Sequence, residues 1–591
     1  MKRALLTAAA IFAFATPSAF AQIAPVAVLS PDDAQRYRQI FADERNGDFA
    51  AAQELVAQLS DRSLVGYAQA EHYLSSHSSH TPVEDLVSWL NQYGDLAIAD
   101  RVYALAVERA SKPIKKHHRI VGYKVTVEVP MPAGAPRARG GGYEDNFGAD
   151  IAISSDAGRA ALAQIDADVR ADQPAEADAV LQALVAANSA PGSDTARLSQ
   201  RVAASYLAEG QDFNAFDVAS RPAGIDRLSA PLLDWDAGFA AYRMGKFDIA
   251  AQHFETLAQV GSVPNYIRSQ SAFWAARAHL ANNDPLPVVS LLTAAAREEP
   301  TFYGLLAERI LGQDSEAAFA DPVVSQSDFD ALMQIPSAHR AVALYQIGET
   351  TWLHEEMMRA MAAMDMRAGE TFAGVAHRMD LPDLELRASE TVAARGRLLT
   401  GLFPVPGYAP TAGYHIDPAL VLAFAREESK FQASAVSGAG ARGLMQIMPG
   451  TASHLNGAAV TNAQLSDPSF SMGLGQNYLE ELLDDLGGNL VELAAAYNAG
   501  PGSVTRWLGT KSSADPLLFI ESMPVQATRT YVKAVLTYYW MYDRRDGRPA
   551  ATLDQTAKGD WPVYRRATNA VQPAPQPNAP PKPAVVSDAS Y

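Results

Sequence analysis

The sequence predicts a protein dominated by α-helices, with a long N-terminal α-superhelical solenoid followed by a smaller, mostly helical C-terminal domain. Three observations lead to this expectation. The chain has 591 residues, which is too long for a single hydrophobic core. From Asp32 to about Glu390 it is rich in Ala and Leu at helical spacing. Short turns also interrupt this stretch repeatedly, as they do in stacked helical hairpins.

The turns of the N-terminal region share one pattern, in which a glycine is followed closely by an aromatic residue and then by an Ala-containing run. The pattern occurs at residues 46–49, 209–213 and 244–248. A helix-turn-helix repeat has this appearance when one aromatic side chain packs between the paired helices. The spacing is irregular, so we predict a degenerate solenoid in which each helix pair contacts chiefly its neighbours.

Changes in composition divide the chain into five parts. The segment 401–407 contains two glycines and two prolines, which is typical of a hinge, so we place a domain boundary directly before it. From Val571 onward, prolines dominate and hydrophobic periodicity is absent. The predicted parts are a signal peptide (1–21), a superhelical scaffold (22–324), a helical linker domain (325–400), a compact domain (401–550) and a Pro-rich flexible tail (551–591).

The N-terminus has the features of a secretory signal. Lys2 and Arg3 precede an apolar run from Ala4 to Ala15, and the sequence Ala-Phe-Ala at 19–21 is a small-x-small cleavage pattern. The apolar run is shorter than the roughly 20 residues that a membrane anchor needs. We therefore expect export to the periplasm, by a cleaved signal and without a membrane anchor.

Composition restricts the partners and the covalent chemistry. A formal net charge of −18 argues against nucleic acid and against a polybasic membrane-surface anchor. The chain has no cysteine, so it has neither disulfides nor a lipid-attachment cysteine. The histidines show no metal-ligand spacing, and we expect no metal or cofactor.

The helix expected from Asp417 to Phe431 carries an acid on its apolar face. At about 100° per residue, Glu428 falls inside the stripe formed by the apolar side chains, whereas Glu427 falls just outside it. Burial disfavours the charged form of an acid, so the pKa of Glu428 should rise from about 4.3. A raised pKa suits a general acid. A buried glutamate held by a structural hydrogen bond is the alternative.

Three further stretches place polar or flexible residues after this helix. The Gly-rich loop 437–443 can bring backbone close to a ligand. The short run 444–449 carries Gln446. Tyr497 and Asn498 stand at the end of a helix that a glycine and a proline terminate, where they either point into a cleft or form a capping turn.

Four motifs in this order resemble the soluble lytic murein transglycosylases. They are Arg-Glu-Glu-Ser (426–429), Gly-Leu-Met-Gln-Ile-Met-Pro (443–449), Ala-Tyr-Asn-Ala-Gly (496–500) and Glu-Ser-Met-Pro (521–524). The match covers residues 408 to 542 and is highly specific. The scaffold resembles the family's α-superhelical domain more weakly, through the stretches 273–278 and 301–306. The resemblance implies a lysozyme-like (α+β, mostly helical) domain attached to a ring or horseshoe of helices.

The resemblance also implies an activity. The family cleaves the β-1,4 bond between N-acetylmuramic acid and N-acetylglucosamine in peptidoglycan and closes a 1,6-anhydro ring. Its catalytic glutamate corresponds to Glu428. The residues expected to bind the glycan by the same resemblance are Gln446, Met448, Tyr497, Asn498, Ser437 and Glu521. The implied partners are glycan strands and other cell-wall enzymes, and we expect a monomer.

The chain departs from the family pattern at two positions. The family commonly has Gln before its catalytic Glu, whereas this chain has Glu427, whose charge would raise the pKa of Glu428 further. The family usually reads Glu-Thr-Arg where this chain has Ala527 before Thr528 and Arg529, which puts a substrate contact there in doubt. Two alternatives remain open: a lysozyme-like hydrolase with the same acid, and an inactive peptidoglycan-binding scaffold.

Overall fold

The computed structural model describes most of the chain between residues 26 and 566. The described ranges are 26–75, 81–116, 119–125, 127, 129–131, 152–221, 226–297, 300–313, 319–510 and 515–566. The predicted signal peptide, and the tail from residue 567 onward, lie outside the described residues. Within the described residues, no helix is both long enough and apolar enough to cross a membrane.

The chain forms two compact units that do not follow chain order. Of the described residues, those between 26 and 131 and between 321 and 395 form the first unit, and those between 152 and 320 and between 396 and 566 form the second. The described elements of the first unit are α1 (Pro31–Asn46), α2 (Phe49–Val56), α3 (Val65–Leu74), α4 (Val83–Tyr93), α5 (Ala99–Ala110), the hairpin strands β1 (Ser111–Lys116) and β2 (Arg119–Val125), α15 (Gln326–Leu332), α16 (Pro336–Ile347), α17 (Leu353–Ala362), α18 (Met366–Arg378) and α19 (Pro382–Ala393).

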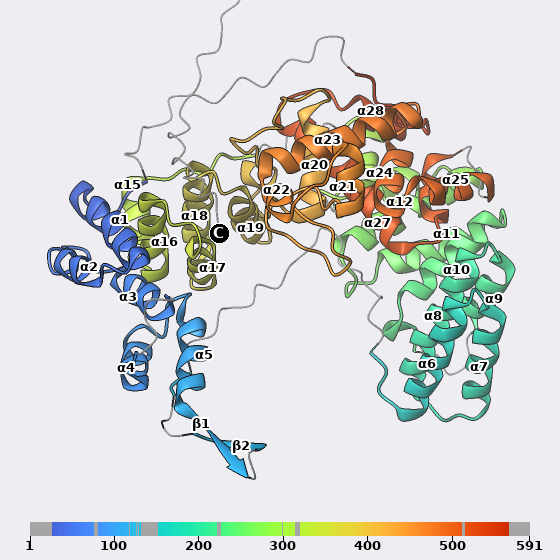
Figure 1. Cartoon of the computed structure of the whole chain (residues 1–591). Coiled ribbons are helices and arrows are strands. Elements are labelled where there is room, and N and C mark those ends of the chain that lie inside the picture. The colour runs from blue at the N-terminus through green and yellow to red at the C-terminus, as the bar shows by residue number, and fades with distance from the viewer. Residues whose placement is uncertain are drawn as a thin grey trace, which may run out of the picture. The chain divides into compact units, whose positions relative to one another are not determined.

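Buried polar contacts join the two chain segments of the first unit, which lie side by side in Figure 1. Glu356 of α17 is fully buried and accepts hydrogen bonds from the Tyr67 hydroxyl of α3 and from Arg340 Nε of α16 at 3.0 Å. Gln346 of α16 bonds the backbone of Leu29, with its Oε1 accepting at 2.9 Å and its Nε2 donating at 2.8 Å. The segment predicted as a separate linker domain therefore packs with the N-terminal helices.

The second unit combines a superhelical segment with the C-terminal domain. Its superhelical elements are α6 (Asp156–Arg170), α7 (Pro174–Ala186), α8 (Gly192–Ala208), α9 (Asp212–Ser220), η1 (Arg227–Ser229), α10 (Leu232–Arg243), α11 (Phe247–Ala258), α12 (Asn265–Ala281), α13 (Val288–Ala296) and α14 (Phe302–Ile310). The C-terminal elements are η2 (Thr400–Leu402), α20 (Pro418–Ser429), α21 (Pro449–Asn456), α22 (Asn462–Ser466), α23 (Pro468–Asp485), α24 (Leu490–Ala499), α25 (Pro501–Thr510), α26 (Pro516–Ser522), α27 (Gln526–Arg545) and α28 (Ala551–Ala557).

The predicted helix-turn-helix pattern is present at all three turns. Gly47, Gly210 and Gly245 have φ values of 85°, 75° and 73° and connect α1 to α2, α8 to α9, and α10 to α11. A positive φ is readily adopted by glycine, which explains the residue type at these turns. Between the helices of the second unit, Trp274 is fully buried and its ring contacts those of Phe239 and Tyr242 edge-on.

The C-terminal domain is longer than predicted. The prediction of a flexible tail beginning at residue 551 is wrong, because α28 and the following residues pack onto the domain. Thr552 accepts a hydrogen bond from Trp540 Nε1 at 3.0 Å, and the backbone N–H of Tyr564 donates to Gly488 at 2.8 Å. The prolines that suggested a tail are concentrated beyond residue 571, whereas residues 551–566 still carry side chains that bury against the domain.

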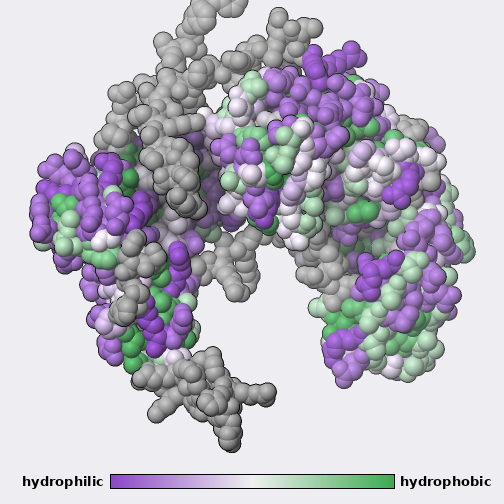
Figure 2. Space-filling view, in the orientation of Figure 1, coloured by the Kyte–Doolittle hydropathy of each residue, from purple (hydrophilic) through white to green (hydrophobic). Residues whose placement is uncertain are grey.

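The surface visible in Figure 2 is predominantly hydrophilic over α1 and α2, while hydrophobic and hydrophilic residues alternate over α6–α9.

Candidate active site

Helix α20 carries the predicted acid and begins at a well-defined N-terminus. Asp417 caps it, with its Oδ1 accepting from the backbone N–H of Ala419 at 3.0 Å, and Pro418 is the first helical residue. Arg548 donates to both carboxylate oxygens of Asp417, at 3.0 and 2.9 Å. The start of α20 is therefore fixed by a cap that is itself fixed by an ion pair.

Helix α20 is buried on more than one face. Leu420, Val421 and Phe424 are at most 1% exposed, as the angular analysis predicted, and Arg426 on another face is only 4% exposed. Arg426 donates to the Leu402 carbonyl at 3.1 Å and lies over the Tyr538 ring at 4.1 Å. Because neighbouring segments surround the helix, Glu427 is half-buried like Glu428. The angular difference predicted between Glu427 and Glu428 is therefore not accompanied by a difference in burial class.

Glu428 accepts a short hydrogen bond from a tyrosine on another helix. The Tyr531 hydroxyl of α27 donates to Glu428 Oε1 at 2.5 Å. Burial raises the pKa of Glu428 to about 8, the Tyr531 hydrogen bond opposes this rise, and the charge of Glu427 adds to it. The predicted direction of the shift is confirmed. At neutral pH Glu428 is therefore protonated and can donate a proton to a bound ligand.

Glu427 is a second acid with a raised pKa beside Glu428. Burial raises its pKa to about 7, against the opposing charges of Arg426 and Lys430. Among the residues that the structure describes, none forms a hydrogen bond with the Glu427 carboxylate. Two neighbouring acids in one half-buried site are expected to titrate as a coupled pair.

The loop after α20 forms a tight double turn. Ser437 and Ala441 exchange hydrogen bonds: the Ser437 N–H donates to the Ala441 carbonyl at 3.0 Å, and Ser437 Oγ accepts from the Ala441 N–H at 3.0 Å. Gly443 has a φ of 79°, and a Cβ there would lie 2.0 Å from the Leu465 carbonyl oxygen. This position therefore requires glycine. The Ser437 side chain is exposed at the tip of the turn.

Gln446 stabilises this loop from within. Its Nε2 donates to the carbonyl oxygens of Ala435 and Gly443 at 3.1 and 2.8 Å. In the part of the chain that the structure describes, no donor reaches its Oε1. Both amide hydrogens are committed to the backbone, so only the amide oxygen is left to accept from a ligand.

Met448 is exposed where the loop meets α21. Its side chain is 44% exposed, and Val436 on the same loop is 53% exposed. Exposed apolar side chains of this size are suited to contact the apolar face of a sugar ring.

Tyr497 and Asn498 stand at the C-terminal end of α24, which Gly500 ends with a φ of 83°. The Tyr497 hydroxyl donates to the Met445 carbonyl at 2.8 Å, and its ring lies 4.9 Å from that of Phe424. Asn498 is exposed, and its Oδ1 accepts from the Thr528 hydroxyl at 2.8 Å. Tyr497 connects α24 to the loop and to α20, while Thr528 connects α24 to α27.

Backbone conformation is unusual around this site. Among the described residues, Lys430, Phe431 and Gln446 have φ values of 50°, 65° and 44°, whereas the other non-glycine residues at positive φ are Asp or Asn. Such conformations are costly for larger side chains and tend to persist at functional sites. All three lie in the segment that connects the acid to the Gln446 loop.

The Glu521 carboxylate accepts hydrogen bonds from residues outside the predicted set. It is 6% exposed, and its Oε1 accepts from Tyr303 at 2.6 Å and from Lys533 at 3.1 Å. Tyr303 belongs to the superhelical segment. The carboxylate is therefore occupied by protein partners, and we leave it out of the substrate-binding set.

Tyr531 is the residue that sequence reasoning missed. Helix α27 contains four tyrosines, and its composition does not distinguish Tyr531 from the other three. One signal was available: Tyr531 lies three residues after Thr528, so both fall on one helix face.

Among the residues described, no group of three or more His, Cys, Asp or Glu side chains could hold a metal ion.

Sequence comparison identifies the domain around this site. Residues 408–520 match the family model described as Transglycosylase SLT domain. The soluble lytic murein transglycosylase of Escherichia coli K12 is 42% identical over 141 residues, which is 22% of this chain and 22% of that protein. The Salmonella typhimurium protein of that name is 38% identical over 152 residues, 25% and 24% of the two chains. These sequence matches thus span about a quarter or less of the relatives' length.

Structural comparison extends the similarity beyond this domain. The 70 kDa soluble lytic transglycosylase of E. coli has a TM-score of 0.54 at 18% identity, covering 90% of this chain and 99% of that chain. An inactive variant of the lytic transglycosylase Slt of Pseudomonas aeruginosa has a TM-score of 0.53 at 21% identity, covering 88% and 74%. The resemblance to the soluble lytic murein transglycosylases and the predicted two-part helical fold are confirmed.

Proposed function

We propose that this protein is a lytic transglycosylase that cleaves the β-1,4 bond between N-acetylmuramic acid and N-acetylglucosamine in peptidoglycan. The observation that carries the proposal is the half-buried Glu428 within the SLT domain, with a pKa raised to about 8 and one tyrosine donor. An acid that stays protonated at neutral pH can protonate the oxygen of a glycosidic bond.

The proposed reaction uses Glu428 twice. Glu428 first gives its proton to the glycosidic oxygen, and the bond from that oxygen to C1 of the muramic acid breaks. The N-acetyl group of the substrate stabilises the oxocarbenium-like centre and so takes the role that a second carboxylate has in other glycosidases. The Glu428 carboxylate then takes the proton of the muramyl 6-hydroxyl as that oxygen attacks C1. A 1,6-anhydro ring forms, and Glu428 is protonated again.

Tyr531 contributes in the second step of this scheme. Once Glu428 has given up its proton, its carboxylate is stabilised by the hydroxyl that donates to it at 2.5 Å. Burial raises the pKa of Tyr531 well above its usual range, so its hydroxyl stays protonated and remains a donor. The same donor holds Glu428 in one orientation throughout the reaction.

The other residues of the site are assigned by what their atoms can offer. The Gln446 Oε1 can accept from a sugar hydroxyl or amide, and the exposed Met448 can lie against a sugar ring. Asn498 is exposed, and in the described part of the chain its amide nitrogen donates no hydrogen bond; Ser437 stands at the tip of the loop. Tyr497 shapes the site through its contacts with Met445 and Phe424.

The comparison with P. aeruginosa gives independent support for a single essential acid. The structure in that comparison is named an inactive mutant in which glutamine replaces a glutamate. We propose that Glu428 has the corresponding role in this chain. We also propose that the protein acts after export to the periplasm, directed by residues 1–21.

The activity is tested with purified peptidoglycan sacculi and the full mature chain. We expect muropeptides with 1,6-anhydro ends, which mass spectrometry distinguishes from reducing ends because they are lighter by one water. In isotopically labelled water, a transglycosylase leaves the new ends unlabelled, whereas a hydrolase labels them. Labelled reducing ends as the only product would overturn the proposal in favour of the lysozyme-like hydrolase.

The role of Glu428 is tested with Glu428→Gln, which is isosteric and cannot act as an acid. We expect turnover to fall by about 10³-fold, within the range of general acid–base catalysis. Glu481→Gln makes the same chemical change at an exposed position of α23 and should leave turnover unchanged. Binding of sacculi without cleavage by the wild-type chain would favour the inactive scaffold.

A further inference from the structure

A buried polar cluster connects the superhelical segment to the helix that carries Tyr531. Lys533 of α27 is 5% exposed, and its Nζ donates to Glu521 of α26 at 3.1 Å and to Gln270 Oε1 of α12 at 3.0 Å. Tyr303 of α14, 2% exposed, donates to Glu521 Oε1 at 2.6 Å. We call these four residues the α27 anchor cluster.

The anchor cluster and the acid occupy different faces of α27. Tyr531 and Lys533 are two residues apart, which separates their side chains by about 200° around the helix axis. Tyr531 reaches Glu428 on α20, whereas Lys533 reaches Gln270 on α12. Helix α27 therefore lies between the acid and the superhelical segment.

We propose that Gln270 and Tyr303 of the superhelical segment are positioning residues for catalysis, because they fix α27 and so place the Tyr531 hydroxyl on Glu428. This inference rests on the proposed function. It gives the superhelical segment a part in the chemical step, although no described residue of that segment hydrogen-bonds to Glu428.

The physical basis is the strict geometry that a buried ion pair needs. Lys533 and Glu521 are both almost fully buried, so their desolvation is offset only while each charge keeps all of its hydrogen-bond partners. Gln270 supplies one partner to the ammonium and Tyr303 supplies one to the carboxylate. Losing either partner favours a shift of α27 toward water or other polar groups.

Such a shift acts directly on the acid. The hydrogen bond from Tyr531 to Glu428 is short, at 2.5 Å, and a hydrogen bond weakens steeply when a shift of its donor bends it away from linearity. Misplacement of a catalytic group by about 1 Å can cost roughly 10²-fold in rate, so a smaller movement has a measurable effect.

The test uses the full chain with Tyr303→Phe and Gln270→Leu, separately and together. Phenylalanine keeps the ring that packs 4.9 Å from Phe273, so the change removes little beyond the hydroxyl. We expect kcat to fall by about tenfold in the double variant, with KM changed less than about twofold. The basic limb of the pH profile should move to higher pH, because the Tyr531 hydrogen bond lowers the pKa of Glu428.

A double-mutant cycle with Tyr531→Phe separates positioning from a general loss of stability. If the anchor cluster acts through Tyr531, then Tyr303→Phe and Gln270→Leu add no further shift of the pH profile in the Tyr531→Phe background. Additive shifts in that background would overturn the proposal, as would a pH profile and kcat equal to those of the wild type.

Glu308→Gln is the matched control within the same interface. Glu308 of α14 is 3% exposed and accepts from Arg544 of α27 at 2.6 Å, but Arg544 lies thirteen residues from Tyr531, about 20 Å along the helix. This variant should lower thermal stability and leave kcat and the pH profile unchanged. If the wild-type chain has no activity at all, it is the proposed function that fails. If the wild type is active and the anchor variants have the same kcat and pH profile as the wild type, only the positioning role is contradicted.

Discussion

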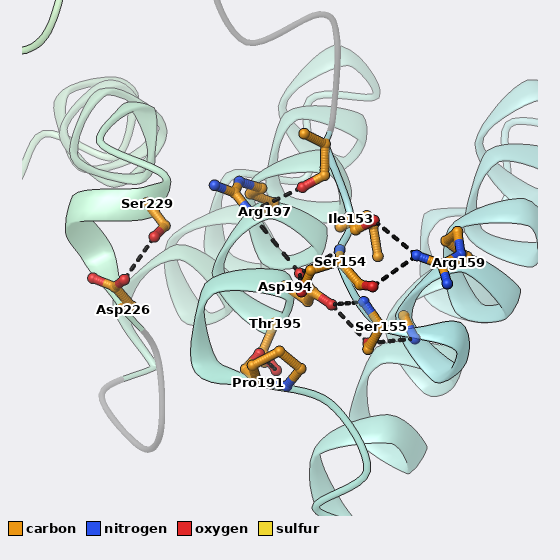
Figure 3. A network of polar contacts seen from close by, with 12 residues as sticks. Ile153, Ser154, Ser155, Arg159, Pro191, Asp194, Thr195, Arg197, Asp226 and Ser229 are labelled. Carbon is orange, nitrogen blue, oxygen red and sulfur yellow. Dashed lines mark hydrogen bonds and ion pairs between the residues drawn. The ribbon is translucent and has the colours of Figure 1, made fainter.

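Two acids in the same compact unit are held in opposite ways. Asp194 of α8 is fully buried, and it accepts hydrogen bonds from the backbone N–H groups and the hydroxyls of Ser154 and Ser155, at 2.6 to 3.0 Å (Figure 3). Glu428 of α20 is half-buried and accepts, among the described residues, one hydrogen bond, from Tyr531. The acid without solvent-exposed surface thus has more hydrogen-bond donors than the partly exposed one.

The pKa of each acid depends on the balance between burial and hydrogen bonds. Burial favours a higher pKa for Asp194, but the bonds from Ser154 and Ser155 outweigh it and lower the pKa to about 2. For Glu428 burial prevails over one hydrogen bond and raises the pKa to about 8. A carboxylate with a complete set of donors serves structure, and one with an incomplete set keeps a proton for chemistry.

Replacing Asp194 should give the largest change in stability. Asp194→Ala removes the acceptor of four hydrogen bonds that join the start of α6 to α8, so we expect the free energy of unfolding to fall by about 3 kcal/mol. Urea denaturation of the variant and the wild type at pH 7 measures this difference in the free energy of unfolding. The wild-type contribution is present above the ordinary pKa of 3.8 and is lost as pH falls toward about 2, because protonation removes the charge that the donors stabilise.

Asp194→Asn is the matched comparison, because it keeps one acceptor oxygen and should lie between alanine and the wild type. Neither variant should change kcat per folded molecule. If Asp194→Ala were as stable as the wild type, the contrast between a structural and a chemical acid would not hold.

Tyr531→Phe should have a smaller effect, on activity rather than on folding. It removes the only hydroxyl that donates to Glu428 among the described residues, so the carboxylate formed during the reaction loses its donor. We expect kcat to fall by about tenfold, which corresponds to about 1.4 kcal/mol of barrier. The basic limb of the pH profile should move upward, because this hydrogen bond lowers the pKa of Glu428.

Tyr539→Phe tests whether this effect is specific. Tyr539 lies on the same helix, and its hydroxyl donates to Asp417 Oδ2 at 3.2 Å instead of to Glu428. The pH profile of this variant should coincide with that of the wild type. Equal profiles for the Tyr531 and Tyr539 variants would contradict the assignment of Tyr531.

The features that the sequence predicts well depend on local chain geometry. Glycine at positive φ explains the turns at Gly47, Gly210 and Gly245, and helical periodicity identifies the buried side of α20 with Leu420 and Phe424. These features need only the residues within one or two turns of the helix.

The features that it misses depend on distant segments. Periodicity shows which face of a helix is buried but not which helix covers it, so the packing of residues 321–395 with the N-terminal helices could not be foreseen. For the same reason Glu521 seemed available to substrate, although Tyr303, more than two hundred residues away, occupies its carboxylate. The partner of Glu428, Tyr531, also comes from a separate helix.

Glu427 depends on both local sequence and distant segments, and its substitution gives the smallest predicted effect on activity. Its position next to Glu428 is evident from the sequence, but its burial arises from the segments packed around α20. The charge of Glu427 raises the pKa of Glu428, so Glu427→Gln should lower that pKa and move the basic limb of kcat/KM to lower pH.

Glu427→Asp keeps the charge and should leave that limb near its wild-type position, and an unmoved limb in Glu427→Gln would contradict the coupling. The pH dependence of the free energy of unfolding gives a second test of the raised pKa of Glu427. Since burial raises the pKa of Glu427 from 4.5 to about 7, the wild type loses stability as pH rises across this range. Glutamine carries no titrating proton, so the stability of Glu427→Gln relative to the wild type should increase between pH 4.5 and 7, which is the opposite of the acid-side loss expected from Asp194.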